Sequence, residues 1–295
     1  MRRNTSAPGI WKKRKTVSRF LEIWKRLKRN RLAMVGLAII LILVLMACFA
    51  EVLFPCGYDA QDIDNSFLAP CLQHPFGTDN LGRDILVRIV YGGRITLTMG
   101  IVSVGIGATL GVILGVLAGY YGGSTDNIIM RCMDSFMAIP GLLLAIAIAA
   151  TLGPSIFNVM IAVGIANVPR FARIVRGPVL AMRGQEYVES AKMINASDFR
   201  ILFHHVIPNV SAPIIVQCTL SIAGAILNAA GLSFLGLGAQ PPSPEWSTMI
   251  SSARVYIRDY WWIITFPGIF IMLAVFALNV IGDGLRDALD PRLKN

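Results

Sequence analysis

The chain has 295 residues, of which 55% are hydrophobic and only 15% are charged, and it carries a formal net charge of +10. This composition is too apolar for a water-soluble globular protein. Because the charges gather in blocks between long uncharged stretches, we predict an all-α integral membrane protein.

The first 31 residues form a basic segment with twelve lysines and arginines, and the uncharged residues 32–50 follow as the first predicted transmembrane helix. No nucleic-acid-binding motif accompanies the basic segment. We therefore assign its charge to membrane topology and to contact with anionic lipid headgroups. Residues 51–94 are predicted to be an extracytoplasmic loop. They include Cys56 and Cys71, for which a disulfide bond and two separate thiols are equal alternatives.

Residues 95–125 are the second predicted span, and a small residue recurs there at every fourth position. Small residues let the backbones of two membrane helices approach closely. We interpret the series as a helix-packing face rather than the lining of a substrate path. Its members are Ser103, Gly107, Gly111, Gly115 and Gly119.

The uncharged residues 135–169 are long enough for two spans, and the sequence Gly-Pro at 153–154 favours a tight turn between them. Residues 213–235 and 260–282 complete a set of six predicted spans. Residues 95–282 are thus a five-helix core, and residues 283–295 form a short tail.

The lysines and arginines are distributed unequally between the two sides of this arrangement. If the N-terminus is cytoplasmic, 22 of the 27 basic residues lie on the cytoplasmic side. Basic residues near span ends favour that side. We therefore predict that both termini are cytoplasmic.

A cytoplasmic loop at 170–209 is longer than a minimal connection between helices. We predict a short helix at 186–194, a turn at Asn195 and a second helix that begins after Ser197 and ends near Pro208. Small side chains at Ser190 and Ala191 would let the first of these helices fit into a groove on another protein.

Several polar groups near the spans have structural interpretations. Arg170, Arg173 and Arg176 recur at helical spacing and are predicted to anchor the fourth span at the membrane surface. His204 and His205 are adjacent and do not share a helix face, so we predict no metal site there. No paired carboxylates or nucleophile with its base fall at one membrane depth, and we predict no enzymatic site.

The loop at 170–209 resembles the signature of permeases from binding-protein-dependent ABC importers. That signature has Glu-Ala-Ala, three residues, Gly, nine residues and Ile-x-Leu-Pro, and here it stands as Glu189-Ser190-Ala191, Asn195 and His205-Val206-Ile207-Pro208. The resemblance implies a coupling helix that docks onto an ATPase subunit, with Glu186, Glu189, Ser190, Ala191, Asn195 and Pro208 as its residues. Asn195 replaces the glycine, and asparagine tolerates the left-handed conformation of such a turn.

The resemblance extends over about residues 20–295 and is to the C-type permeases of dipeptide and oligopeptide importers. It rests on segments at 29–31, 76–84, 119–123, 236–242 and 282–291, among them Phe-Gly-Thr-Asp-Asn-Leu-Gly-Arg-Asp and Gly-Tyr-Tyr-Gly-Gly. It implies the type I ABC importer permease fold in a bacterial inner membrane.

The same resemblance implies a second homologous permease, two ABC ATPases and an extracytoplasmic substrate-binding protein as partners. The sequence contains no Gly-Lys pair and therefore no phosphate-binding P-loop. ATP and Mg are accordingly expected on the ATPase chains, with no cofactor in this one. The alternatives are a permease for nickel or another small solute and, from a different class, an ion-coupled secondary transporter.

Overall fold

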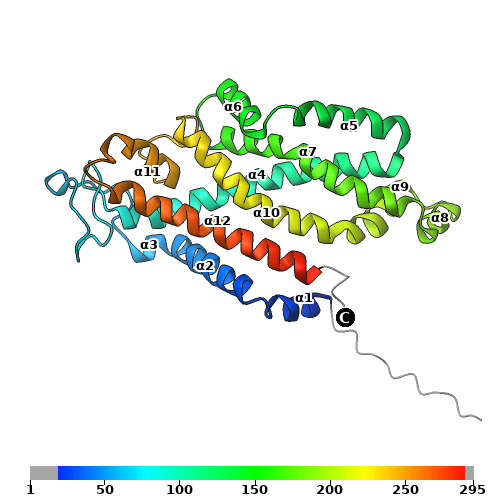
Figure 1. Cartoon of the computed structure of the whole chain (residues 1–295), viewed down its shortest axis with the longest axis horizontal. Coiled ribbons are helices and arrows are strands. Elements are labelled where there is room, and N and C mark those ends of the chain that lie inside the picture. Colours follow the sequence, from blue (N-terminus) through cyan, green and yellow to red (C-terminus); the bar gives the residue numbers. More distant parts are fainter. Residues whose placement is uncertain (1–18, 290–295) are drawn as a thin grey trace, which may run out of the picture.

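The computed structural model describes residues 19–289, and this part of the chain is an elongated bundle of α-helices (Figure 1). The helical elements are α1 (Arg19–Leu27), α2 (Arg31–Cys48), α3 (Ala50–Leu53), η1 (Ile63–Asn65), α4 (Ile85–Tyr121), α5 (Gly123–Met137), α6 (Gly141–Leu152), α7 (Ile156–Arg183), α8 (Glu186–Met193), α9 (Asp198–Ile201), η2 (Leu202–Val206), α10 (Ile207–Phe234), α11 (Trp246–Ala253), η3 (Arg254–Tyr256) and α12 (Trp262–Leu289).

Within residues 19–289, five helical segments are long and apolar enough to cross a membrane. They are α2, α4, α7, α12 and the segment Asp198–Phe234, which joins α9, η2 and α10. A sixth span exists if α5 and α6 are counted together, although the two helices meet at an angle of 87°. The predicted six spans therefore correspond to five long helices and one bent pair.

The bent pair differs from the straight span predicted at the start of residues 135–169. Helix α5 ends at Met137, and α6 begins after Pro140. Proline lacks the amide hydrogen needed in a helix interior and disfavours helical geometry at the residue before it, so the helix breaks at this position. The predicted turn before α7 is present, with Gly153 at φ +88°.

Two helices are longer than the uncharged stretches that predicted them. Helix α4 begins at Ile85, where the Asp84 carboxylate accepts a hydrogen bond from the Val87 amide. Helix α7 continues through Pro169 to Arg183, so the first part of the predicted loop at 170–209 is helical. The charged residues that mark the predicted ends of these spans lie within the helices in the structure.

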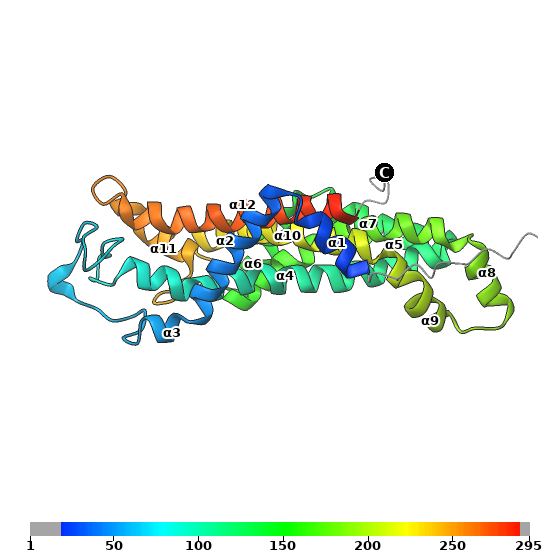
Figure 2. The ribbon, with the colours of Figure 1, turned by 90° about the horizontal axis from the view of Figure 1, so that it is seen from below.

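The bundle has different structures at its two ends (Figures 1 and 2). One end carries the loops of residues 54–84 together with α11 and its flanking loops, which we call the loop cap. The opposite end carries α8 and α9, called here the α8–α9 hairpin (residues 186–201). Leu27 of α1 and Ala33 of α2 pack against Ala288 near the end of α12. In Figure 1, α1 and the end of α12 lie toward the hairpin.

Helices α4 and α7 run parallel and form the most extensive helix pair of the bundle. The pairing register shows their common direction, because Gly107 lies beside Gly164 while Gly119 lies beside Val179. Helix α10 packs on both of them and on α12, and α2 covers the other side of α12. The α4–α7 pair therefore connects the central membrane region with the hairpin.

Candidate functional site

The α8–α9 hairpin is held against the bundle by a small apolar cluster. Val188 and Ala191, three residues apart on α8, face inward and pack with Ile201, Val206 and other residues of the inner bundle. Ala191 is only 8% exposed, so it supports the hairpin from inside instead of lying on the outer face as predicted. Glu186, Glu189 and Ser190 are exposed on the outer side of α8.

Asn195 forms the turn of the hairpin in the left-handed conformation, with φ +57°. The Ala196 amide donates to the Ala191 carbonyl at 3.1 Å, which is the six-residue hydrogen bond of a Schellman helix end. Asparagine therefore serves at the position where the family signature has glycine. Ser197 then caps α9, and its hydroxyl accepts from the Arg200 amide.

Substitution of Asn195 tests the requirement for a left-handed residue. We expect Asn195→Gly to preserve the hairpin, whereas Asn195→Val should destabilise it by about 1–2 kcal/mol, because a side chain branched at Cβ clashes at positive φ. Hydrogen exchange of the Ala196 amide in the purified chain measures the difference. Equal protection in the two variants would show that the turn conformation is not limiting.

The second helix of the hairpin does not end near Pro208, as predicted, but continues into α10. Pro208 cannot donate to the carbonyl four residues before it, and the preceding turn widens into the π-helical η2, where the Ile207 amide donates to the Leu202 carbonyl. The Asn209 side chain donates to the His205 carbonyl at 2.7 Å. The hairpin is thus joined to a membrane span without a flexible connection.

A hydrogen-bonded contact also attaches the hairpin to the end of α4. The Asp198 carboxylate accepts from the Tyr120 hydroxyl at 2.7 Å and from the Tyr121 hydroxyl at 3.2 Å. The sequence contained the Gly-Tyr-Tyr-Gly-Gly segment as part of the resemblance, but no local pattern connected it with Asp198. The hairpin is therefore attached to both α4 and α10.

The predicted small-residue face of α4 lies against α7. A Cβ atom added at Gly107 would lie 2.8 Å from the Gly164 carbonyl oxygen, and one at Gly119 would lie 2.9 Å from the Arg176 carbonyl oxygen. Gly111 and Gly115 make equally close approaches to α7, and Ser103 is fully buried. We call this contact the α4–α7 seam.

The three arginines of α7 have different environments. Arg176 makes a bidentate ion pair with Asp126 of α5, and Arg173 pairs with Asp134 further along α5. Arg170 has no ion-pair partner among residues 19–289. Arg173 and Arg176, two of the three arginines predicted to anchor the fourth span, therefore join α7 to α5 by ion pairs.

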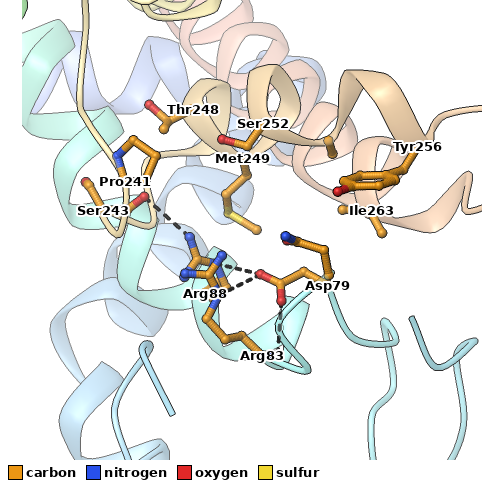
Figure 3. A pocket seen from close by; sticks show the side chains of 12 residues that line it. Asp79, Arg83, Arg88, Pro241, Ser243, Thr248, Met249, Ser252, Tyr256 and Ile263 are labelled. Carbon is orange, nitrogen blue, oxygen red and sulfur yellow. Dashed lines mark hydrogen bonds and ion pairs between the residues drawn. The ribbon is translucent and has the colours of Figure 1, made fainter. Parts of the chain in front are cut away.

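A second polar centre, which local sequence patterns did not predict, lies in the loop cap (Figure 3). Asp79 is 6% exposed, and its carboxylate accepts from Nε of Arg83 at 2.7 Å and lies 3.8 Å from Nε of Arg88. Arg88 also donates to backbone carbonyls, including that of Ser243, at 3.3–3.4 Å. This Asp79 cluster joins the start of α4 to the loop before α11.

The Asp79 cluster borders a cavity of about 30 Å³, room for about one water molecule. This volume is too small for a transported solute. Elsewhere in the loop cap, Cys56 and Cys71 are both exposed and free in the structure. A disulfide between them therefore stays one of the two alternatives.

Comparison with known proteins identifies the family. Residues 111–295 match the model of the binding-protein-dependent transport system inner membrane component, and residues 18–70 match the N-terminal transmembrane domain of oligopeptide transport permease C. Among solved structures, the chain is similar to one from the MetNI methionine ABC transporter in inward-facing conformations. The TM-score is 0.57 at 16% identity, and the match covers 70% of this chain and 98% of that one. This similarity shows the fold.

Curated relatives match almost the whole chain. The dipeptide transport system permease protein DppC of Alkalihalophilus pseudofirmus is 50% identical, over 95% of this chain and 92% of the relative. The di/tripeptide transport system permease protein DppC of Pseudomonas aeruginosa is 45% identical, over 93% and 92%. The glutathione transport system permease protein GsiD of Escherichia coli is 48% identical, over 92% and 90%. The chain therefore belongs to the family of binding-protein-dependent transport system inner membrane components, multi-pass permeases of ABC importers.

Proposed function

We propose that this chain is the permease subunit of an ATP-driven importer that carries di- or oligopeptides into the cytoplasm. The substrate class is supported by the relatives, whose names specify dipeptides, di- and tripeptides, and glutathione, which is itself a tripeptide. Identities of 45–50% over more than nine-tenths of this chain favour the same broad substrate class here.

The observation that carries the proposal is the exposed surface of the α8–α9 hairpin. Met193 and Ile194 are 88% and 80% exposed, and Phe199 of α9 is 69% exposed. Glu186 and Glu189 lie on the same short hairpin. Large apolar side chains gathered at a protruding end, with charges beside them, are typical of a protein-binding surface. We propose that an ABC ATPase covers this surface.

The proposed assembly contains this chain, a second homologous permease, two ABC ATPases and an extracytoplasmic substrate-binding protein. ATP and Mg are bound by the ATPases, because this sequence lacks a P-loop. The excess of basic residues in the sequence segments predicted to lie on the same side as the hairpin favours a cytoplasmic location for that end of the bundle. The loop cap then faces the binding protein on the opposite side.

The proposed mechanism transfers force from the ATPases to the spans. Closure of the ATPases on ATP displaces the hairpin, whose contact through Asp198 and the uninterrupted η2–α10 connection moves α4 and α10. Because α4 and α7 are closely packed at the α4–α7 seam, they move together. The central path consequently changes its access between the two sides of the membrane.

Two substitutions on the exposed side of α8 test this function: one reverses a charge and the other replaces a small side chain with a large one. We expect Glu189→Lys and Ser190→Trp to reduce peptide uptake at least about tenfold while ATP hydrolysis persists, because both changes lie on the exposed side of α8 and disturb docking without disturbing the fold. Uptake of labelled peptide and ATPase activity are measured in proteoliposomes containing the whole complex. Glu22→Lys, an exposed charge reversal on α1, is the matched control.

Unimpaired uptake in both hairpin variants would contradict the coupling role. Parallel uptake assays with a labelled dipeptide, glutathione and nickel determine the substrate class. Co-purification with the tagged chain tests the proposed partners. If the purified chain alone moves peptide along an ion gradient, the proposed dependence on ATPases is wrong.

A further inference from the structure

Helices α7, α10 and α12 line an open groove of about 580 Å³ in the half of the bundle that carries the hairpin. Arg170 of α7 and Arg286 of α12 line this groove, which we call the arginine groove. Its other walls are mostly apolar and include Ile174, Val216 and Leu220. The arginine groove therefore combines two cationic groups with an apolar surface.

Neither arginine of this groove has an ion-pair partner among residues 19–289, and no carboxylate of that range lines the groove. The contrast within α7 is direct. Arg173 and Arg176 point to α5 and pair with Asp134 and Asp126, whereas Arg170 lies on the groove side without such a partner. The groove thus has an uncompensated positive charge.

The depth of the groove in the membrane follows from the neighbours of α12. Gly284, two residues before Arg286, packs against Leu27 and Ala33. Leu27 is the last residue of the basic helix α1, and Ala33 lies in the first turn of the apolar helix α2. Arg286 is therefore at the level where apolar surface meets the basic segment, which is the level of lipid headgroups.

We propose that the arginine groove binds the phosphate of an anionic phospholipid. Planar guanidinium groups bind phosphate oxygens through paired, charge-assisted hydrogen bonds. The apolar residues Ile174, Val216 and Leu220 offer a surface for the first part of an acyl chain. A groove of about 580 Å³ is within the range of sites for small organic ligands.

The charge of the groove favours a lipid over a transported peptide. A peptide with free ends carries an ammonium group and a carboxylate, and the ammonium group would meet no acidic partner among the described groove residues. An anionic lipid such as phosphatidylglycerol carries one net negative charge beside apolar chains. Its chemistry matches both parts of the groove wall.

Lipid binding to the purified full complex tests the proposal. Phosphatidylglycerol, phosphatidylcholine, inorganic phosphate and an unlabelled dipeptide are each added to the delipidated complex, and thermal stability and lipid retention by native mass spectrometry are measured. We expect phosphatidylglycerol to stabilise the wild type, and expect the double variant Arg170→Gln, Arg286→Gln to bind it at least about tenfold more weakly. Arg131→Gln, an exposed arginine of α5, is the matched control and should bind as the wild type does.

A second variant separates loss of binding from loss of folding. Arg170→Lys with Arg286→Lys keeps both charges and should retain most of the phosphatidylglycerol effect, since lysine also binds phosphate. Wild-type lipid binding by the glutamine variant, or equal stabilisation by phosphatidylcholine, would overturn the proposal. Stabilisation of the wild type by inorganic phosphate alone would also overturn it. So would stabilisation by the dipeptide that disappears in the glutamine variant, because each result assigns the groove to a different ligand.

Discussion

Gly111→Leu is expected to prevent stable accumulation of the chain in the membrane. A Cβ atom at Gly111 would meet the Phe171 side chain, and it would lie 2.7 Å from the Val168 carbonyl oxygen and 3.0 Å from the Ala172 amide nitrogen. Two of these neighbours are backbone atoms of α7 and cannot rotate away. Overfilling a packed contact costs about 1–3 kcal/mol, and we expect the upper part of this range or more for a whole leucine.

Gly105→Leu is the matched control for this substitution. Gly105 lies on the same helix and is exposed, and a Cβ atom added there would have no neighbouring atom within 4 Å. Membrane abundance and the size-exclusion profile of the solubilised chain are compared for the two variants. Wild-type abundance and profile for Gly111→Leu would mean that the α4–α7 seam does not limit folding.

Asp79→Asn is expected to destabilise the loop cap by about 3–5 kcal/mol. The substitution removes the negative charge that Asp79 places beside the buried guanidinium groups of Arg83 and Arg88. Arg83 and Arg88 are only 8% and 4% exposed. Both guanidinium groups would then stay buried without the Asp79 carboxylate, beside a cavity with room for about one water molecule. The measurement is thermal unfolding of the purified chain, followed by limited proteolysis within residues 54–84.

Asp59→Asn provides the comparison for this second substitution. Asp59 also pairs with Arg83, at 3.5 Å, but its side chain is 49% exposed. Its loss should cost about 1 kcal/mol or less. Combining Asp79→Asn with Arg88→Met should recover part of the lost stability, since it removes the buried charge that Asp79→Asn leaves without an acidic partner. Equal effects of the two single substitutions would contradict the role of burial.

Local patterns in the sequence predicted the features that depend on local chemistry. The Gly-Pro turn before α7, the short helix α8 and the Ser197 cap follow from backbone preferences of a few neighbouring residues. The left-handed turn at Asn195 was implied by the family resemblance. The break before α6 does not follow from the length of the uncharged stretch, and Pro140 is the local signal for it.

Contacts between distant segments were not predictable from one sequence. Small residues at every fourth position indicated a packing face on α4, but nothing in that spacing identified α7 as its partner. The Asp79 cluster includes a contact between Arg88 and the Ser243 carbonyl, 155 positions apart. Because they are charged, Arg88 and Arg94 fall in the predicted extracytoplasmic loop of residues 51–94, whereas α4 contains both. In the structure Arg94 donates to the Ala47 and Cys48 carbonyls and pairs with Glu51, so its charge is satisfied within the bundle.

The unbroken length of α4 links events on the two faces of the membrane. Its 37 residues correspond to about 55 Å, from the loop cap to the tyrosines that hold Asp198. A rod of this length that pivots by about 10° at its centre moves each tip by about 5 Å, in opposite directions. Narrowing of the gap beside one tip is then accompanied by widening beside the other. Geometry alone would prevent both mouths of a path beside such a rod from opening at once.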